Sequence, residues 1–162
     1  ECYKPLISAM SKFFNRLSVS PDINENQMKV SIIGKWYDLP GEAIEPIKDV
    51  IDETKDYDNF FLNFCVNYNG REEIVDALKL MIKKVQAGKL DPDLITKDTV
   101  KENLYTSYFL PPNLIIKNGK KKSLGGFLLW DSAFSHPYFS GKLFPDFTRK
   151  DLLQAIGDYQ KK

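Results

Sequence analysis

The sequence predicts an α/β fold in which helices flank a largely parallel sheet. Three short apolar runs have the composition of buried strands, and segments with helical periodicity separate them. This alternation is typical of parallel sheets, because a crossover helix returns the chain to the start of the next strand. With 162 residues and 43% apolar content the chain can bury one core, so we expect a single domain over residues 1–162.

The first half of the chain supplies two helices and two strands. Apolar residues spaced by three and four predict a helix over Pro5–Leu17, and the β-branched run Met28–Ile33 predicts a strand. We expect the next helix over about 41–55, with Pro46 in its first turn, where a proline costs no hydrogen bond. The run Phe60–Val66 is apolar almost throughout, which indicates a strand covered on both faces.

A tight turn and a long helix follow. Asn and Gly in the turn Asn67–Arg71 should supply positive φ, and Arg71 should open the helix over Glu72 to about Gln86. The expected buried side of this helix consists of Ile74, Val75, Leu78, Met81, Ile82 and Val85. Thr96 is placed to cap a short helix that ends near Leu104, and Asn113–Lys117 reads as the third strand.

The stretch Leu124–Phe147 packs seven aromatic rings into twenty-four residues. A basic, glycine-containing loop, 118–126, connects the third strand to it, and we expect an apolar helix from Phe127. Ligands in α/β proteins commonly bind beyond the carboxyl ends of strands, where such a loop meets the next helix. This loop is therefore the first candidate for a binding site.

Composition excludes several classes of function. The 23 basic and 22 acidic residues nearly cancel, which argues against a nucleic-acid partner. The two cysteines, Cys2 and Cys65, suggest no disulfide framework and fit a reducing, cytoplasmic compartment. No apolar run reaches the length of a membrane span. The chain starts at Glu1 without a Met, so we expect a longer parent polypeptide.

Three segments resemble the cis-prenyltransferases, the undecaprenyl diphosphate synthase family: FLNFCVNYNGREEIVDAL, LYTSYFLPPNLIIKNG and FLLWDSAFSHPYFSGKLFPDFTRKDLLQAI. The family's Asn-Tyr-Gly-Gly-Arg motif is matched by Asn67, Tyr68, Gly70 and Arg71, with Asn69 in place of a Gly. Its Phe-Leu-Leu-Trp motif is matched by Phe127–Trp130. The resemblance implies the family's fold, a dimer with a hydrophobic tunnel, and magnesium-dependent addition of isopentenyl diphosphate to an allylic diphosphate.

The sequence departs from the family pattern where the chemistry is expected. The family's Asp-Gly-Asn-Gly-Arg loop, which helps to place magnesium and diphosphate, has no equivalent here. In the family two Arg and a Ser hold isopentenyl diphosphate, and their positions carry Lys117, Ser123 and Gly125. A magnesium-binding Glu is replaced by His136, a ligand that magnesium rarely takes, so magnesium binding by this chain is doubtful. The candidate substrate-binding residues are Lys117, Gly119, Lys121, Lys122, Ser123 and Gly125, and the candidate metal ligand is His136.

Each candidate has a simpler alternative reading. The basic loop could be a solvated turn, and His136 a surface histidine. Arg71 could bind an anion at its helix start, but we read it as structural. The aromatic rings could line a lipid tunnel or form a subunit contact, but we read most of them as core.

Three hypotheses for the function remain open. The first is a weakly active or non-catalytic subunit in polyprenyl diphosphate synthesis, which binds prenyl diphosphates and pairs with itself or with a catalytic cis-prenyltransferase, peripheral to the membrane through its lipid substrate. The second is an active cis-prenyltransferase seen without its N-terminal part. The third is an unrelated small α/β binding module.

Overall fold

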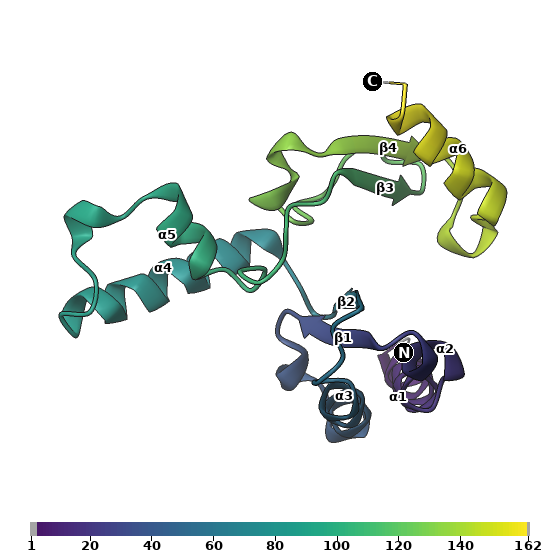
Figure 1. The fold of residues 1–162 in the computed structure, drawn as a ribbon, viewed down its shortest axis with the longest axis horizontal. Coiled ribbons are helices and arrows are strands. Elements are labelled where there is room, and N and C mark those ends of the chain that lie inside the picture. The colour runs from purple at the N-terminus through teal and green to yellow at the C-terminus, as the bar shows by residue number, and fades with distance from the viewer. Residues whose placement is uncertain (1–2, 162) are drawn as a thin grey trace. The chain divides into compact units, whose positions relative to one another are not determined.

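The computed structural model describes residues 3–161, and the chain divides into two compact units between Tyr68 and Asn69 (Figure 1). Each unit contains a two-stranded sheet, and both sheets are parallel. Helices pack beside the strands in both units. The predicted fold class, a parallel α/β arrangement flanked by helices, is therefore confirmed, whereas the single domain stays a prediction.

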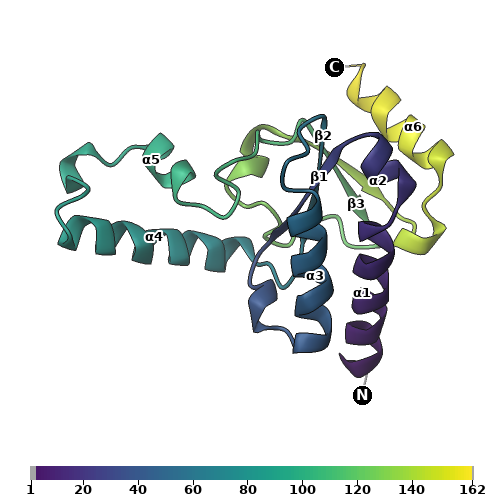
Figure 2. The same cartoon turned by 60° about the horizontal axis from the view of Figure 1, so that its bottom comes forward.

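The first unit consists of α1 (Tyr3–Ser18), α2 (Pro21–Glu25), β1 (Met28–Ile33), α3 (Gly41–Glu53) and β2 (Phe60–Cys65). The sheet pairs Met28 with Phe60 at one end and Ile33 with Cys65 at the other. Figure 2 shows α1 and α3 running side by side next to this sheet. Four of these five elements match the sequence expectation to within a few residues, and α2 was not expected.

The core of the first unit forms where α1, α2, α3 and β1 meet. Its buried members are Phe14, Ile23, Val30, Ile47 and Val50. Thr54, which is fully buried, ties α3 to β1: its hydroxyl accepts a hydrogen bond from Val30 N at 3.0 Å and donates one to Val50 O at 2.7 Å. A buried hydroxyl is tolerated here because it both donates and accepts a hydrogen bond.

Two expectations for this unit were wrong. Pro46 is the sixth residue of α3 and lies beyond the first turn, so it can give no N–H to the carbonyl of Glu42. The strand β2 is not covered on both faces, because Phe60 and Phe61 are 53% and 61% exposed. An apolar run identifies a strand but does not show how many of its faces are covered.

The second unit consists of α4 (Gly70–Gln86), α5 (Lys97–Glu102), β3 (Leu114–Asn118), β4 (His136–Ser140) and α6 (Arg149–Tyr159). The second sheet pairs Leu114 with His136 and Asn118 with Ser140. Thr96 caps α5 as predicted, through a reciprocal capping box with Thr99. Figure 1 shows α6 beside β3 and β4.

The apolar helix expected from Phe127 does not form. Gly125, Gly126 and Leu128 have φ angles of 63°, 84° and 45°, which are left-handed values that a right-handed helix cannot contain. A turn and a short 3₁₀ helix, Asp131–Phe134, lead instead into β4, which was not expected either.

The buried side of α4 also differs from the expected one. It is formed by Gly70, Glu73, Ala77 and Met81, whereas Val75, Leu78 and Ile82 are 47%, 48% and 56% exposed. Of the expected set only Met81 is buried, while Ile74 and Val85 are partly buried. Small residues at Gly70 and Ala77 let this side approach its neighbours, which a count of apolar residues cannot reveal.

Candidate diphosphate-binding site

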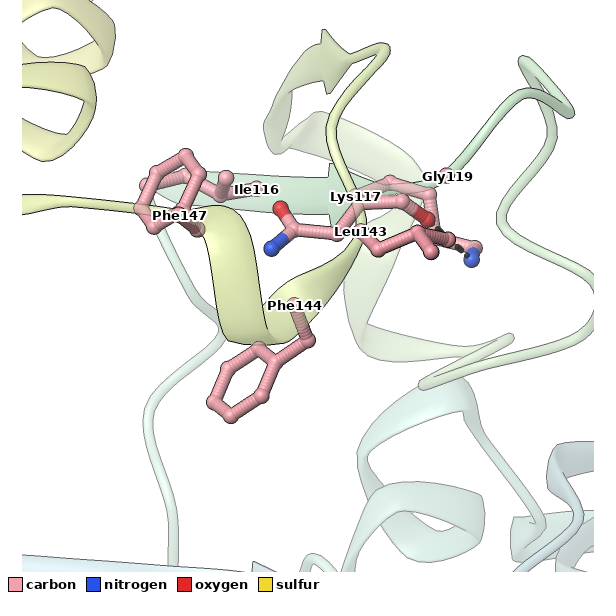
Figure 3. Close-up of a pocket in the computed structure, with 7 residues that line it drawn as sticks. Ile116, Lys117, Gly119, Leu143, Phe144 and Phe147 are labelled. Carbon is pink, nitrogen blue, oxygen red and sulfur yellow. Dashed lines mark hydrogen bonds between the residues drawn. The ribbon is translucent and has the colours of Figure 1, made fainter.

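A cavity of about 500 Å³ opens beside the carboxyl end of β3 (Figure 3). Its walls come from the end of β3 and from the segment that follows β4. The lining residues are Ile116, Lys117, Asn118, Gly119, Leu143, Phe144 and Phe147. The lining thus combines four apolar side chains with one lysine and one asparagine, which is the composition of a site for a small ligand with a charged head and an apolar part.

Two of the predicted substrate-binding residues, Lys117 and Gly119, line this cavity. The ammonium of Lys117 donates to the carbonyl of Asn118 at 2.9 Å, as Figure 3 shows. Gly119 has a φ of 99°, a value that a residue with a side chain rarely adopts, and its N–H donates to Lys142 O at 2.8 Å. The backbone therefore fixes the start of the loop against the segment after β4.

The other four predicted residues lie on the exposed part of the loop. Lys121, Lys122, Ser123 and Gly125 are all exposed and do not line the cavity. The hydroxyl of Ser123 accepts a hydrogen bond from Gly125 N at 3.2 Å, which leaves its own proton free to bind an anion. The structure thus places Lys117 and Gly119 together at the cavity and the remaining residues along the adjoining loop.

The residues of the predicted turn Asn67–Arg71 have separate structural roles. Asn67 has a φ of 48°, as expected for the turn, and its side chain donates to Lys35 O at 2.9 Å. Asn69 caps α4 by accepting from Arg71 N at 2.9 Å. Tyr68 ends the first unit.

Gly70 does not adopt positive φ, contrary to the expectation, and serves close packing. A Cβ atom at Gly70 would lie 2.3 Å from Gly126 O and 2.9 Å from Leu129 Cβ. The start of α4 therefore supports the turn that follows the basic loop.

His136 lies in β4 with its side chain 14% exposed. Its Nε2 is 3.4 Å from a carboxylate oxygen of Asp158, and its buried Nδ1 has no partner among residues 3–161. Within the same residues no three His, Cys, Asp or Glu side chains gather closely enough to hold a metal ion. One imidazole and one carboxylate do not suit magnesium, which prefers several oxygen ligands.

A buried polar network holds the turn between the loop and β4. Asp131 is 5% exposed, and its carboxylate accepts a hydrogen bond from Lys101 Nζ at 2.6 Å. The same ammonium donates to the carbonyl and the hydroxyl of Thr106, at 2.7 and 3.2 Å. Thr106 N in turn donates to the carboxylate of Glu73, which is 1% exposed. Lys101 therefore neutralises a carboxylate that would otherwise be costly to bury.

Several residues of the site were missed by sequence reasoning. Asn118 lines the cavity, and its buried Oδ1 has no hydrogen-bond partner among residues 3–161. Phe144 and Phe147 belong to the group of rings that were read mostly as core, with a lipid tunnel as an alternative, and both line the cavity.

The pairing of Lys142 with Asp151, at 2.8 and 2.9 Å, was also missed. The spacing of Thr148 and Asp151 is that of a capping box at the start of α6, so the sequence could have shown the role of Asp151 as a cap but not its pairing with Lys142. The ammonium of Lys142, together with the Thr148 hydroxyl, holds the pKa of the Asp151 carboxyl well below its usual range.

Comparison with known proteins identifies the family. The family model described as "Putative undecaprenyl diphosphate synthase" matches residues 3–162. A tritrans,polycis-undecaprenyl-diphosphate synthase (geranylgeranyl-diphosphate specific) from Methanopyrus kandleri is 37% identical over 98% of this chain and 59% of its own length. An isoprenyl transferase from Streptococcus thermophilus is 36% identical over 93% of this chain and 61% of its own length. The chain therefore spans about three fifths of the curated relatives that it matches.

Two solved structures are similar in fold. Lavandulyl diphosphate synthase from Lavandula x intermedia, in complex with dimethylallyl diphosphate, superposes with a TM-score of 0.88 at 30% identity, over 97% of this chain and 67% of that one. A probable undecaprenyl diphosphate synthase from Campylobacter jejuni gives a TM-score of 0.77 at 26% identity, over 98% of this chain and 69% of that one. Sequence and fold agree, and the chain belongs to the cis-prenyltransferase family of undecaprenyl diphosphate synthases.

Proposed function

We propose that this chain binds prenyl diphosphates and acts in polyprenyl diphosphate synthesis as a weakly active or non-catalytic subunit, paired with itself or with a catalytic cis-prenyltransferase. The observation that carries the proposal is Lys117. It occupies the position of a family Arg and lies in the wall of a cavity that also presents apolar side chains. A cation beside an apolar surface suits a diphosphate head with a short prenyl chain.

The substitutions in the loop explain why activity should be low. An Arg holds a phosphate through two parallel hydrogen bonds, whereas Lys117 supplies one compact charge. Ser123 and Gly125 further remove a guanidinium and a hydroxyl that the family pattern contains. Each charge-assisted bond contributes about 1.5–3 kcal/mol, so the loss of two or three weakens binding by roughly a hundredfold or more.

The basic loop can still attract an anionic ligand, but it does not orient that ligand. Lys120, Lys121 and Lys122 are exposed on the loop beside the cavity, where they raise the local concentration of an anionic ligand. Flexible ammonium groups do not hold reacting atoms in line, and catalysis depends on that alignment more than on attraction. Binding with little turnover is the expected consequence.

A second candidate is an active cis-prenyltransferase in which the remainder of the polypeptide completes the site. The names of the relatives favour it, since the Methanopyrus kandleri and Streptococcus thermophilus proteins are both named as enzymes of this class. The substitutions at Lys117, Ser123, Gly125 and His136 argue against it, because they lie inside the segment that the chain does contain.

One experiment separates the two candidates. The purified chain is incubated with magnesium, farnesyl diphosphate and labelled isopentenyl diphosphate, alone and with a catalytic homologue from the same cell. We expect little or no product from the chain alone and more product from the mixture than from the homologue alone. Efficient turnover by the chain alone would overturn the subunit proposal.

The control for this assay uses the Lys117→Ala variant in the same mixture. If the chain contributes through its cavity, the variant should stimulate the homologue less than the unchanged chain does. Equal stimulation by both would show that the cavity is not the contributing part.

A further inference from the structure

Two loops leave the second sheet at the same edge. The basic loop follows β3 and the segment 141–147 follows β4, and parallel strands end on one side of a sheet. Gly119 N donates to Lys142 O at 2.8 Å, so the two loops start in direct contact. Lys142 also pairs with Asp151, which ties the first turn of α6 to this edge. We call the surface formed by residues 119–125 and 141–150 the loop edge.

Positive charge is concentrated at the loop edge. The stretch 117–151 contains seven basic and three acidic residues, a net charge of +4, although the whole chain carries only +1. Lys120, Lys121 and Lys122 are all exposed, and so are Arg149 and Lys150 at the start of α6. The charge balance of the whole chain therefore conceals a local cationic surface.

Large apolar side chains protrude from the same edge. Leu143 is 62% exposed and Phe144 is 81% exposed, and the segment 141–146 contains no buried or partly buried residue. Moving an exposed aromatic ring and an adjacent leucine from water into an apolar phase is favourable. Their position beside several ammonium groups is the arrangement of a surface that binds anionic bilayers.

We propose that the loop edge docks on an anionic lipid bilayer, with the exposed lysines at the lipid phosphates and with Leu143 and Phe144 inserted at the boundary of the acyl chains. No helix among residues 3–161 is long and apolar enough to cross a bilayer. The charge of the lysines and the insertion of the apolar side chains act together, because neither alone attaches a protein stably to a bilayer. The cavity beside Lys117 opens at the same edge, which would bring it next to a membrane.

Vesicle binding without any added prenyl diphosphate tests this proposal independently of the proposed function. The chain is sedimented with vesicles of equal parts phosphatidylcholine and phosphatidylserine, and with vesicles of phosphatidylcholine alone. We expect binding to the anionic vesicles that weakens with salt. Replacing Lys120, Lys121 and Lys122 by Gln should lower the partition coefficient about a hundredfold, since each lysine near the surface contributes about fivefold.

Matched variants separate docking from general electrostatics. Replacing Lys79, Lys83 and Lys89 by Gln removes the same charge from exposed positions on and after α4, and should leave vesicle binding nearly unchanged. Phe144→Ser should weaken binding about tenfold or more, whereas Phe134→Ser, at a side chain that is 100% exposed elsewhere, should not.

Three outcomes would overturn the proposal. The first is no binding of the chain to anionic vesicles, and the second is an equal loss of vesicle binding from the two triple-lysine variants. The third is that the chain binds heparin as tightly as it binds anionic vesicles and that Phe144→Ser leaves both unchanged, which would show that the loop edge binds a soluble polyanion.

Discussion

At the residue scale, the candidate site depends on a few positions whose chemistry the sequence already shows. Lys117, Ser123 and Gly125 could be compared with the family pattern directly, because their neighbours form unmistakable motifs. The orphaned carboxamide oxygen of Asn118 could not be foreseen. Whether a polar atom is buried without a hydrogen-bond partner depends on three-dimensional packing, which the spacing of residues along the sequence does not predict.

Restoring the guanidinium groups should strengthen diphosphate binding. In the double variant Lys117→Arg/Ser123→Arg, we expect pyrophosphate to bind at least about tenfold more tightly, because bidentate hydrogen bonds replace a point charge. The measurement is isothermal titration with pyrophosphate. The variant Gln86→Arg/Lys89→Arg adds the same charge at exposed positions on another surface and serves as the control. An equal gain in both variants would mean that charge alone governs binding.

The ion pair between Lys101 and Asp131 gives a stability prediction. Lys101→Met should lower the free energy of unfolding by about 3–5 kcal/mol, since it leaves the Asp131 carboxylate buried without a cation. Urea unfolding followed by circular dichroism measures this change. The double variant Lys101→Met/Asp131→Leu should recover much of the loss, and a double variant as unstable as the single one would contradict the assignment.

At the element scale, the strands β1, β2 and β3 and the helices α1, α3, α4 and α5 were predicted from the sequence, whereas α2, β4 and α6 were not. The first strand, β1, has the predicted bounds, because a β-branched run ending at a Gly is a strong local signal. Residues 127–130 gave the opposite outcome. Their apolar character favours a helix, but the left-handed backbone at Gly125, Gly126 and Leu128 prevents one. Tertiary contacts at Gly70 hold this conformation.

The close contact between α4 and the turn at residues 125–130 can be tested by substitutions at two glycines. Gly70→Ala should destabilise the protein by about 1–3 kcal/mol, because the new methyl group would lie 2.3 Å from Gly126 O. Gly157→Ala, in the interior of α6 with open space around it, should instead stabilise by about 0.5–1 kcal/mol. Thermal unfolding of the two variants measures these changes. A melting temperature of Gly70→Ala equal to that of the unchanged protein would contradict the close contact between Gly70 and Gly126.

The start of α6 has a predictable pH dependence. The pKa of Asp151 is lowered by Lys142 and Thr148, so its contribution to stability is fully present above its unfolded value of about 3.9 and is lost as the pH falls below that. The gap in melting temperature between the unchanged protein and Asp151→Asn should be nearly constant from about pH 7 to pH 5 and shrink at lower pH. A gap that persists unchanged at pH 2 would contradict this.

At the scale of the whole molecule, sequence reasoning identified the family but not the arrangement of its parts. The segments that carry the resemblance span both compact units, and the boundary between the units falls inside the motif Asn67–Arg71. The near-neutral total charge concealed the cationic loop edge, because composition averages over all surfaces. Function at this scale therefore depends on local features that fold and composition do not report.

The central claim is that the cavity beside β3 still binds a prenyl diphosphate through Lys117. Isothermal titration of the chain with farnesyl diphosphate, and separately with farnesol, tests it most directly. We predict saturable binding of the diphosphate, much weaker binding of the alcohol, and a loss of affinity of at least about tenfold in Lys117→Ala but not in Lys89→Ala. No binding of farnesyl diphosphate, or equal affinity in the unchanged chain and Lys117→Ala, would contradict the claim.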